Sequence, residues 1–250
     1  MAFLSCKLYK VGAPALEKAV TLFANRGTRE YDEQWQQKLN FTVRPIEALQ
    51  KRGVGYLSEV FYDRIIYVRT VDPETYQTDS RPQKQTVGPI VVTLYIKTPL
   101  EYVLGIFSNY NTAREIAGIA NGLLAPEPKG LADGVHGVRF LIDQKEQEIR
   151  AIPGFSNVSE LRVEEVNDPH VDSVWLHGTK LDESAEYHKF VVDGLSGGRI
   201  RFLTLLYKGR NYYLLDDGRI FTRQGTEAQE DYVLMYELVS MLDGVNAVKF

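Results

Sequence analysis

Residues 194–198 read GLSGG and match the G-x-S-x-G pattern of esterase nucleophiles, with Ser196 in the serine position. A serine hydroxyl attacks an acyl group only with a base beside it, and in that fold the serine lies between a strand and a helix. Here the next residues, RIRFLTLLY, predict a strand, and all four histidines precede Ser196. We therefore interpret this segment as a glycine turn. Without a following helix, it is not predicted to cradle a phosphate either.

Four potential metal ligands lie close together in the chain: Asp168, His170, Asp172 and His177. Carboxylates and imidazoles bind zinc, manganese or iron. However, Asp168-Pro169-His170 is typical of a turn, and strand alternation from Asp172 would place His177 on the opposite face. We interpret the group as an exposed loop followed by a strand histidine.

A second acidic pattern consists of Asp133 followed by Asp143-Gln144-Lys145. In restriction-type nucleases, two carboxylates hold a divalent metal and a lysine steadies the attacked phosphate or the hydroxide. Asp143 also follows an apolar run, where a helix or turn start would place an acidic residue anyway. A metal-dependent nuclease or hydrolase using Asp133, Asp143 and Lys145 is therefore the alternative hypothesis.

The strongest local charge signal lies near the C-terminus, where the segment from Lys189 to Arg223 contains seven basic residues and only three acidic ones. The candidate binding residues within it are Arg199, Arg201, Lys208, Arg210, Arg219 and Arg223. Arginines on a sheet with a nearby Tyr212 or Tyr213 could hold phosphates and stack bases. The same residue types are also enriched at protein interfaces. A third interpretation is that the arginines pair with acidic residues in the first turns of the following helix.

Strand periodicity assigns faces to these basic residues. Alternation places Arg199 and Arg201 on one face, together with Leu203, Leu205 and Tyr207. The next runs are 211–215 and 219–222, and Asp216-Asp217-Gly218 between them is a strong hairpin signal. In the last run, Arg219, Phe221 and Arg223 share a face.

The other elements follow from apolar spacing and turn residues. Strands are expected at 3–11, 55–71, 90–97, 102–108, 158–166 and 173–176, and helices at 16–23, 111–124 and 226–242. Residues 30–39 are expected to form a loop or short helix, and 181–192 are ambiguous. Residues 72–89 contain three prolines and a glycine, and they predict an exposed, mobile loop or a domain boundary.

These elements predict an α+β fold, mainly antiparallel sheet with helices packed on one face. The expected division is an N-terminal region over 1–80 and a C-terminal region over 81–250, with one continuous domain as the alternative. A chain of 250 residues is long enough to bury a substantial core.

Composition narrows the function classes. The net charge of −4 argues against a surface that is basic throughout, and the single Cys6 excludes an intrachain disulfide. The sequence contains neither a signal-peptide pattern nor an apolar run of about 18 residues. We expect a cytoplasmic, non-enzymatic binding protein without cofactor or membrane partner, contacting nucleic acid, a protein partner or a second copy.

Overall fold

The computed structural model describes residues 3–32, 38–46, 55–98, 101–124, 134–166, 171–192, 199–223 and 228–249. The strands are β1 (Phe3–Val11), β2 (Gly27–Asp32), β3 (Lys38–Ile46), β4 (Gly55–Val71), β5 (Thr78–Thr98), β6 (Glu101–Phe107), β7 (Val135–Gly137), β8 (Arg139–Phe140), β9 (Phe155–Glu164), β10 (Ser173–His177), β11 (Arg199–Tyr207), β12 (Arg210–Leu215), β13 (Arg219–Arg223) and β14 (Val248–Lys249). The helices are α1 (Leu16–Ala24), α3 (Tyr110–Leu124), α4 (Ile142–Arg150), α5 (Ala185–Tyr187) and α6 (Ala228–Gly244), with short helical turns η1 (Ala13–Ala15), η2 (Leu181–Glu183) and η3 (His188–Val192).

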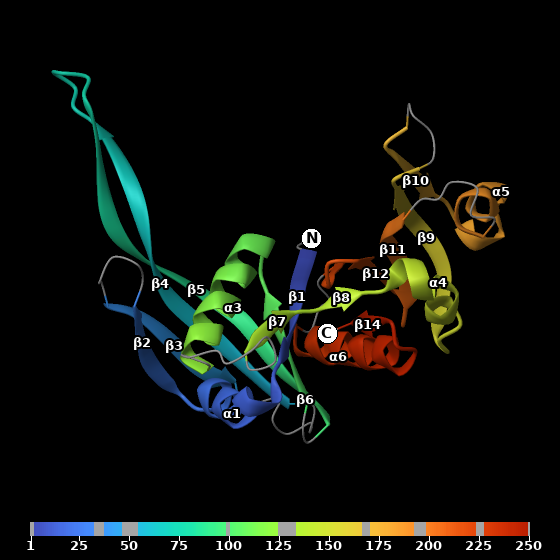
Figure 1. The fold of residues 1–250 in the computed structure, drawn as a ribbon, viewed down its shortest axis with the longest axis horizontal. Helices are drawn as coiled ribbons and strands as arrows, with labels where there is room; N and C mark the ends of the chain where they lie inside the picture. The colour runs from blue at the N-terminus through green and yellow to red at the C-terminus, as the bar shows by residue number, and fades with distance from the viewer. Residues whose placement is uncertain are drawn as a thin grey trace.

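One large antiparallel sheet runs through the whole molecule (Figure 1). Its strand order is β10-β9-β11-β12-β13-β1-β6-β5-β4-β3-β2, and β7 pairs with β1 beside this path. A separate two-stranded sheet joins β8 to β14. The expected α+β class, with antiparallel strands and packed helices, is confirmed.

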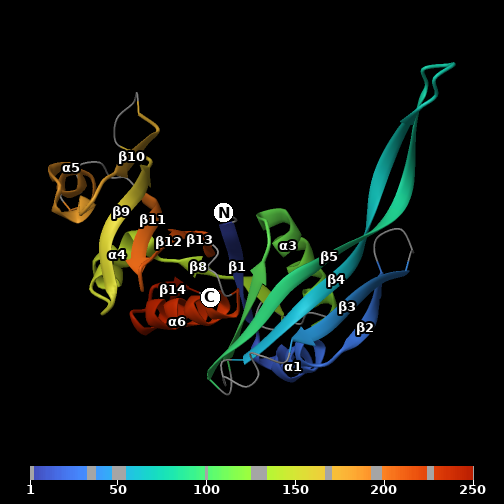
Figure 2. The same cartoon turned by 180° about the vertical axis from the view of Figure 1, so that it is seen from behind.

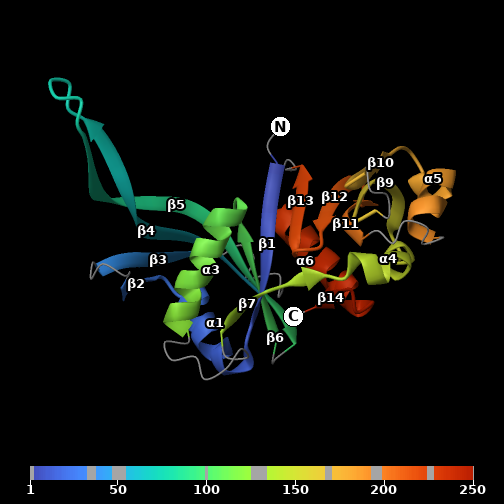
Figure 3. The ribbon, with the colours of Figure 1, turned by 45° about the horizontal axis from the view of Figure 1, so that its top comes forward.

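Strand β1 joins the two halves of the sheet, because it pairs with β13 along one edge and with β6 along the other. Cys6 and Leu8 belong to the core that contains α6, whereas Tyr9 and Val11 belong to the core that contains α1 and α3. Alternate residues of a strand point to opposite faces. The helices therefore lie on opposite faces of the sheet, not on one face as expected, and Figure 3 shows α3 and α6 on either side of β1.

Most strand and helix predictions are confirmed, including the hairpin at Asp216-Asp217-Gly218. Gly218 has a positive φ of +82°, and a Cβ atom there would lie 2.1 Å from the Val138 carbonyl oxygen, so this turn requires glycine. The prediction of a loop or helix over 30–39 is wrong for its described part, because residues 30–32 end β2 and residues 38–39 begin β3.

The prediction of a loop over residues 72–89 is also wrong, although the expected exposure is confirmed. Only residues 72–77 form a turn, and residues 78–89 belong to β5. Pro82 is tolerated because this outer part of the hairpin has only two strands. The missing N–H group of the proline therefore takes no hydrogen bond from a third strand. Ser80 pairs with Arg69 inside the hairpin, and the division into regions 1–80 and 81–250 stays a prediction.

The β4–β5 hairpin extends well beyond its neighbouring strands. We call residues 64–85 the arm; β4 and β5 pair there from Arg64 and Gln85 out to Val71 and Thr78. Every residue from 69 to 86 is exposed, and Figure 2 shows the arm projecting from the body. A two-stranded ribbon is only marginally stable by itself in water, so the arm depends on how its base is held.

Asp63 holds the base of the arm. Its buried carboxylate accepts hydrogen bonds from the Asn40 backbone nitrogen at 2.9 Å and the Thr86 hydroxyl at 2.7 Å, and the Lys84 amine lies 2.8 Å away. Burial alone would raise the pKa of Asp63, but the hydrogen bonds from Lys84, Thr86 and Asn40 outweigh it and leave the pKa below its ordinary value of 3.8. Asp63 thereby connects β3, β4 and β5.

We expect Asp63→Asn to lower the free energy of unfolding by about 1–3 kcal/mol at neutral pH, because it removes charge-assisted hydrogen bonds from a buried site. A carboxylate with a lowered folded-state pKa stabilises the fold above its unfolded pKa, and this stabilisation is lost as the pH falls through the folded pKa. The difference between wild type and variant should therefore narrow below pH 3.8.

Urea unfolding at neutral and acidic pH measures this difference. Asp79→Asn is the matched control, because Asp79 forms an exposed pair with Arg81 on the arm and should change stability by less than about 1 kcal/mol. Equal effects of the two variants at neutral pH would contradict the anchoring role.

None of the helices in the described ranges combines the length and apolar character that a membrane span requires.

Candidate functional site

Four aromatic side chains follow one another across the C-terminal half of the sheet, on the face opposite α6. They are Trp175 on β10, Phe202 on β11, Tyr213 on β12 and Phe221 on β13, and we call them the aromatic row. The ring centroids of Trp175 and Phe202 lie 5.7 Å apart, as do those of Phe202 and Tyr213, the latter pair stacked with 26° between the planes. Trp175 is 60% exposed.

The aromatic row lines an open groove of about 610 Å³. The remaining lining residues are Arg162, Glu164, Arg201, Leu215, Asp216 and Arg219. Neighbouring side chains of β12 point the other way: Tyr212 and Leu214 are completely buried in the core beneath α6. Of the two tyrosines that the sequence offers as stacking residues, only Tyr213 therefore lies on the open face.

A β-bulge at Arg201 shapes the groove. Ile200 pairs with Val163 and Phe202 pairs with Arg162, so Arg201 is an extra residue in β11. Ile200 and Leu203 are both buried in the core, whereas Arg201 and Phe202 both line the groove. The predicted grouping of Arg201 with Leu203, Leu205 and Tyr207 is wrong, because period-two alternation does not hold across a bulge.

The arginines of this face are held by carboxylates. Asp216 accepts a hydrogen bond from Arg199 Nη2 at 3.0 Å and also pairs with Arg201, whose Nε lies 3.0 Å from Glu164 Oε2. The hydrogen bond to Asp216 raises the pKa of Arg201, so the guanidinium stays charged. Arg219 Nε lies 2.7 Å from Asp217 Oδ2. The groove therefore carries charges of both signs.

Arg219 also contacts aromatic rings at the end of the groove. Its Cζ atom lies 5.2 Å from the ring centroid of Tyr110, at the start of α3, and 5.8 Å from that of Phe221. Arg219 and Phe221 share a face as predicted. The side chain of Arg223 lies outside the described part of that strand.

Lys208 and Arg210 lie elsewhere, against α6. The Lys208 amine contacts the Glu237 carboxylate at 2.5 Å, and Arg210 pairs with Asp231. Asp231 is in the first turn of α6 and is only 1% exposed. Among the six basic residues, then, Arg199, Arg201 and Arg219 come together, whereas Lys208 and Arg210 fasten the β11–β12 hairpin to the helix.

We expect Arg210→Ala to lower the free energy of unfolding by roughly 3 kcal/mol, because it leaves a buried carboxylate without its arginine. Lys208→Ala removes a half-exposed pair and should cost less than about 1 kcal/mol. Chemical denaturation of both variants measures the two effects. A stability loss for Arg210→Ala no larger than that for Lys208→Ala would contradict the structural role of Arg210.

The other sequence candidates are dispersed or lie outside the described residues. Asp143 accepts a hydrogen bond from the Ile200 backbone nitrogen at 3.0 Å, and Lys145 pairs with Glu148 at 2.9 Å. His177 is exposed and lies 3.5 Å from Glu160. Asp133, Asp168, His170 and Ser196 are in segments that are not described. Within the described residues, no three His, Cys, Asp or Glu side chains form a group that could hold a metal ion.

Sequence reasoning missed Arg162, Trp175 and Phe202. Trp175 lies in a predicted strand. The only signal that it faces solvent is the polar His177 two residues later, which alternation places on the same face. The bulge hides the orientation of Phe202 from any count of alternation.

No protein-family model matches this chain, and no curated protein sequence is significantly similar to it.

Proposed function

We propose that the protein binds single-stranded nucleic acid in the groove of the C-terminal half-sheet, with bases stacked on the aromatic row. The observation that carries this proposal is four aromatic residues on neighbouring parts of one uncovered sheet face, with Trp175 mostly exposed. Base–aromatic stacking contributes about 1–3 kcal/mol per base and tolerates any sequence. In a duplex the base faces are already stacked, so the groove favours a single strand.

Arginine side chains border the aromatic rings of the groove. Arg162, Arg201 and Arg219 line the groove between or beside the aromatic residues. A phosphate can replace a carboxylate as the partner of such a guanidinium, with the same two-pronged geometry. Each arginine already has a carboxylate partner, so a phosphate that takes the place of this carboxylate adds little new charge neutralisation. Few counterions are then released on binding. Stacking then supplies most of the affinity, and we expect a shallower salt dependence than that of a free basic surface.

Charge balance also favours a second candidate, a protein partner. Four arginines of this face (Arg162, Arg199, Arg201 and Arg219) pair with four carboxylates (Glu164, Glu165, Asp216 and Asp217). Aromatic residues and arginine are the side chains enriched at protein interfaces. Such a partner would use the same groove. No contact of Asp143 or Lys145 favours the hydrolase alternative over these two.

Fluorescence anisotropy with mixed-sequence single- and double-stranded oligonucleotides, at about 50 and 200 mM salt, tests the proposal. We expect the single strand to bind more tightly than the duplex. Trp175→Ala and Phe202→Ala should each weaken single-strand binding roughly 5- to 150-fold, which corresponds to one lost stacking contact.

Tyr76→Ala is the matched control, because Tyr76 is 81% exposed at the tip of the arm and lies outside the groove. Thermal denaturation checks that Phe202→Ala, which removes a half-buried ring, leaves the protein folded. Absence of single-strand binding at low salt, or equal binding by wild type and Trp175→Ala, would refute nucleic-acid binding and direct the search to a protein partner.

A further inference from the structure

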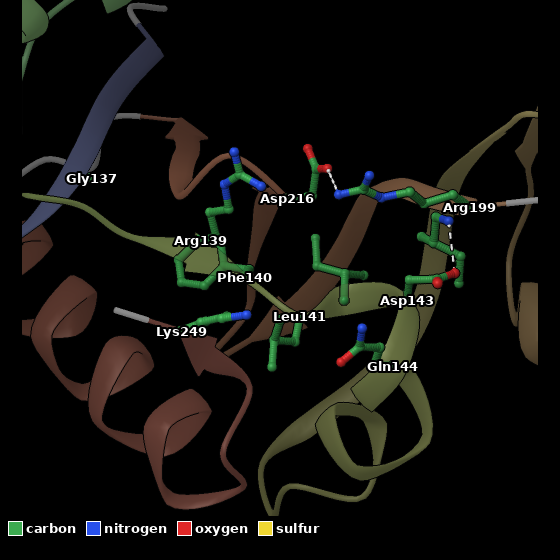
Figure 4. A pocket seen from close by; sticks show the side chains of 11 residues that line it. Gly137, Arg139, Phe140, Leu141, Asp143, Gln144, Arg199, Asp216 and Lys249 are labelled. Atoms are coloured by element: carbon green, nitrogen blue, oxygen red, sulfur yellow. Dashed lines mark hydrogen bonds and ion pairs between the residues drawn. The ribbon is translucent and has the colours of Figure 1, made fainter.

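A second cavity, of about 550 Å³, lies next to the groove and shares Asp216 with it (Figure 4). We call it the Arg139 pocket. Residues from β8, the first turn of α4, the start of β11, the β12–β13 turn and the C-terminal β14 form its walls. Its volume lies within the range of small-molecule sites, about 300–1,000 Å³. The proposed binding of single-stranded nucleic acid does not involve this cavity.

The floor of the Arg139 pocket is apolar and rigid. Phe140, Ile142 and Ile200 line it, and all three are almost completely buried in the core beneath α6. Side chains packed in this way keep one conformation. Leu141, which is half-buried, is the apolar lining side chain that opens onto the cavity above this rigid floor.

Two exposed cations lie at the rim of the cavity. Arg139 and Lys249 are exposed and directly opposite each other in the β8–β14 pair, and Figure 4 shows both side chains at the edge of the cavity. Like charges in directly opposite positions destabilise a strand pair. Among the described residues, neither side chain has a carboxylate within ion-pair distance. An anion between them would turn this repulsion into attraction.

The acidic residues of the pocket do not supply that anion. Asp143 accepts the hydrogen bond from the Ile200 nitrogen, and Asp216 accepts hydrogen bonds from both Arg199 and Arg201. Arg199 reaches the rim opposite Arg139, as Figure 4 shows. Three cations thus line the cavity against two carboxylates, which leaves a net positive charge.

We propose that the Arg139 pocket binds a nucleoside phosphate. The phosphate lies between Arg139 and Lys249, where an arginine fork and a lysine ammonium supply the donors that phosphate oxygens accept. The base lies against the half-buried Leu141 side chain, and the Gln144 amide at the edge of the cavity is available to its polar groups. This site is separate from the aromatic row and does not depend on strand binding.

Isothermal titration calorimetry of the full chain with AMP, GMP, CMP and UMP tests this proposal, with the unphosphorylated nucleosides as comparison. We expect at least one monophosphate to bind with a dissociation constant below about 1 mM, and its nucleoside to bind at least roughly tenfold more weakly. Arg139→Gln and Lys249→Gln should each weaken monophosphate binding roughly tenfold or more. Arg69→Gln, which removes an exposed arginine on the arm, should leave it unchanged.

A further variant separates loss of the site from loss of the fold. Lys249→Glu places an opposite charge beside Arg139, so its melting temperature should equal or exceed that of the wild type while monophosphate binding is abolished. Trp175→Ala should bind monophosphates as the wild type does, even if it no longer binds strands. Failure of all four monophosphates to bind, or binding unaffected by Lys249→Glu, would overturn the proposal.

Discussion

The alternation of side chains along β1 is the constraint on which the rest of the structure depends. Cys6 and Leu8 need cover on one face of the sheet, and Tyr9 and Val11 need it on the other. The chain meets both needs with separate helix layers, α6 on one face of the sheet and α1 with α3 on the other. The C-terminal half therefore keeps one face without a helix among the described residues, and that face carries the aromatic row.

Local irregularities then place chemistry on this face. The bulge at Arg201 brings a guanidinium and the Phe202 ring to the same side of β11, which a regular strand cannot do. Asp216 at the end of β12 contacts both Arg199 and Arg201, so one carboxylate sets the position of two arginines. The groove and the Arg139 pocket share this carboxylate, which makes it the point where the two cavities meet.

Much of the fold could be predicted because strands and turns have local signals. The Asp216-Asp217-Gly218 hairpin and the helix ending near Leu242 are encoded by adjacent residues. The aromatic row could not be predicted, because Trp175 and Phe202 are distant in the chain and meet only through strand pairing with β9 between them. The proline content of residues 72–89 was misleading for another reason: prolines exclude a central strand, but they do not exclude a two-stranded ribbon.

Because the arm is long, a small rotation at its base displaces its tip by several ångströms. Eight residue pairs, from Arg64 and Gln85 to Val71 and Thr78, extend it by roughly 25 Å beyond the Asp63 anchor. For a lever of this length, a rotation of about 10° at the base moves the tip by roughly 4 Å. The carboxylate that holds β3, β4 and β5 together lies at the base of this lever, so a change in its hydrogen bonds would displace Tyr76 far more than it displaces the sheet.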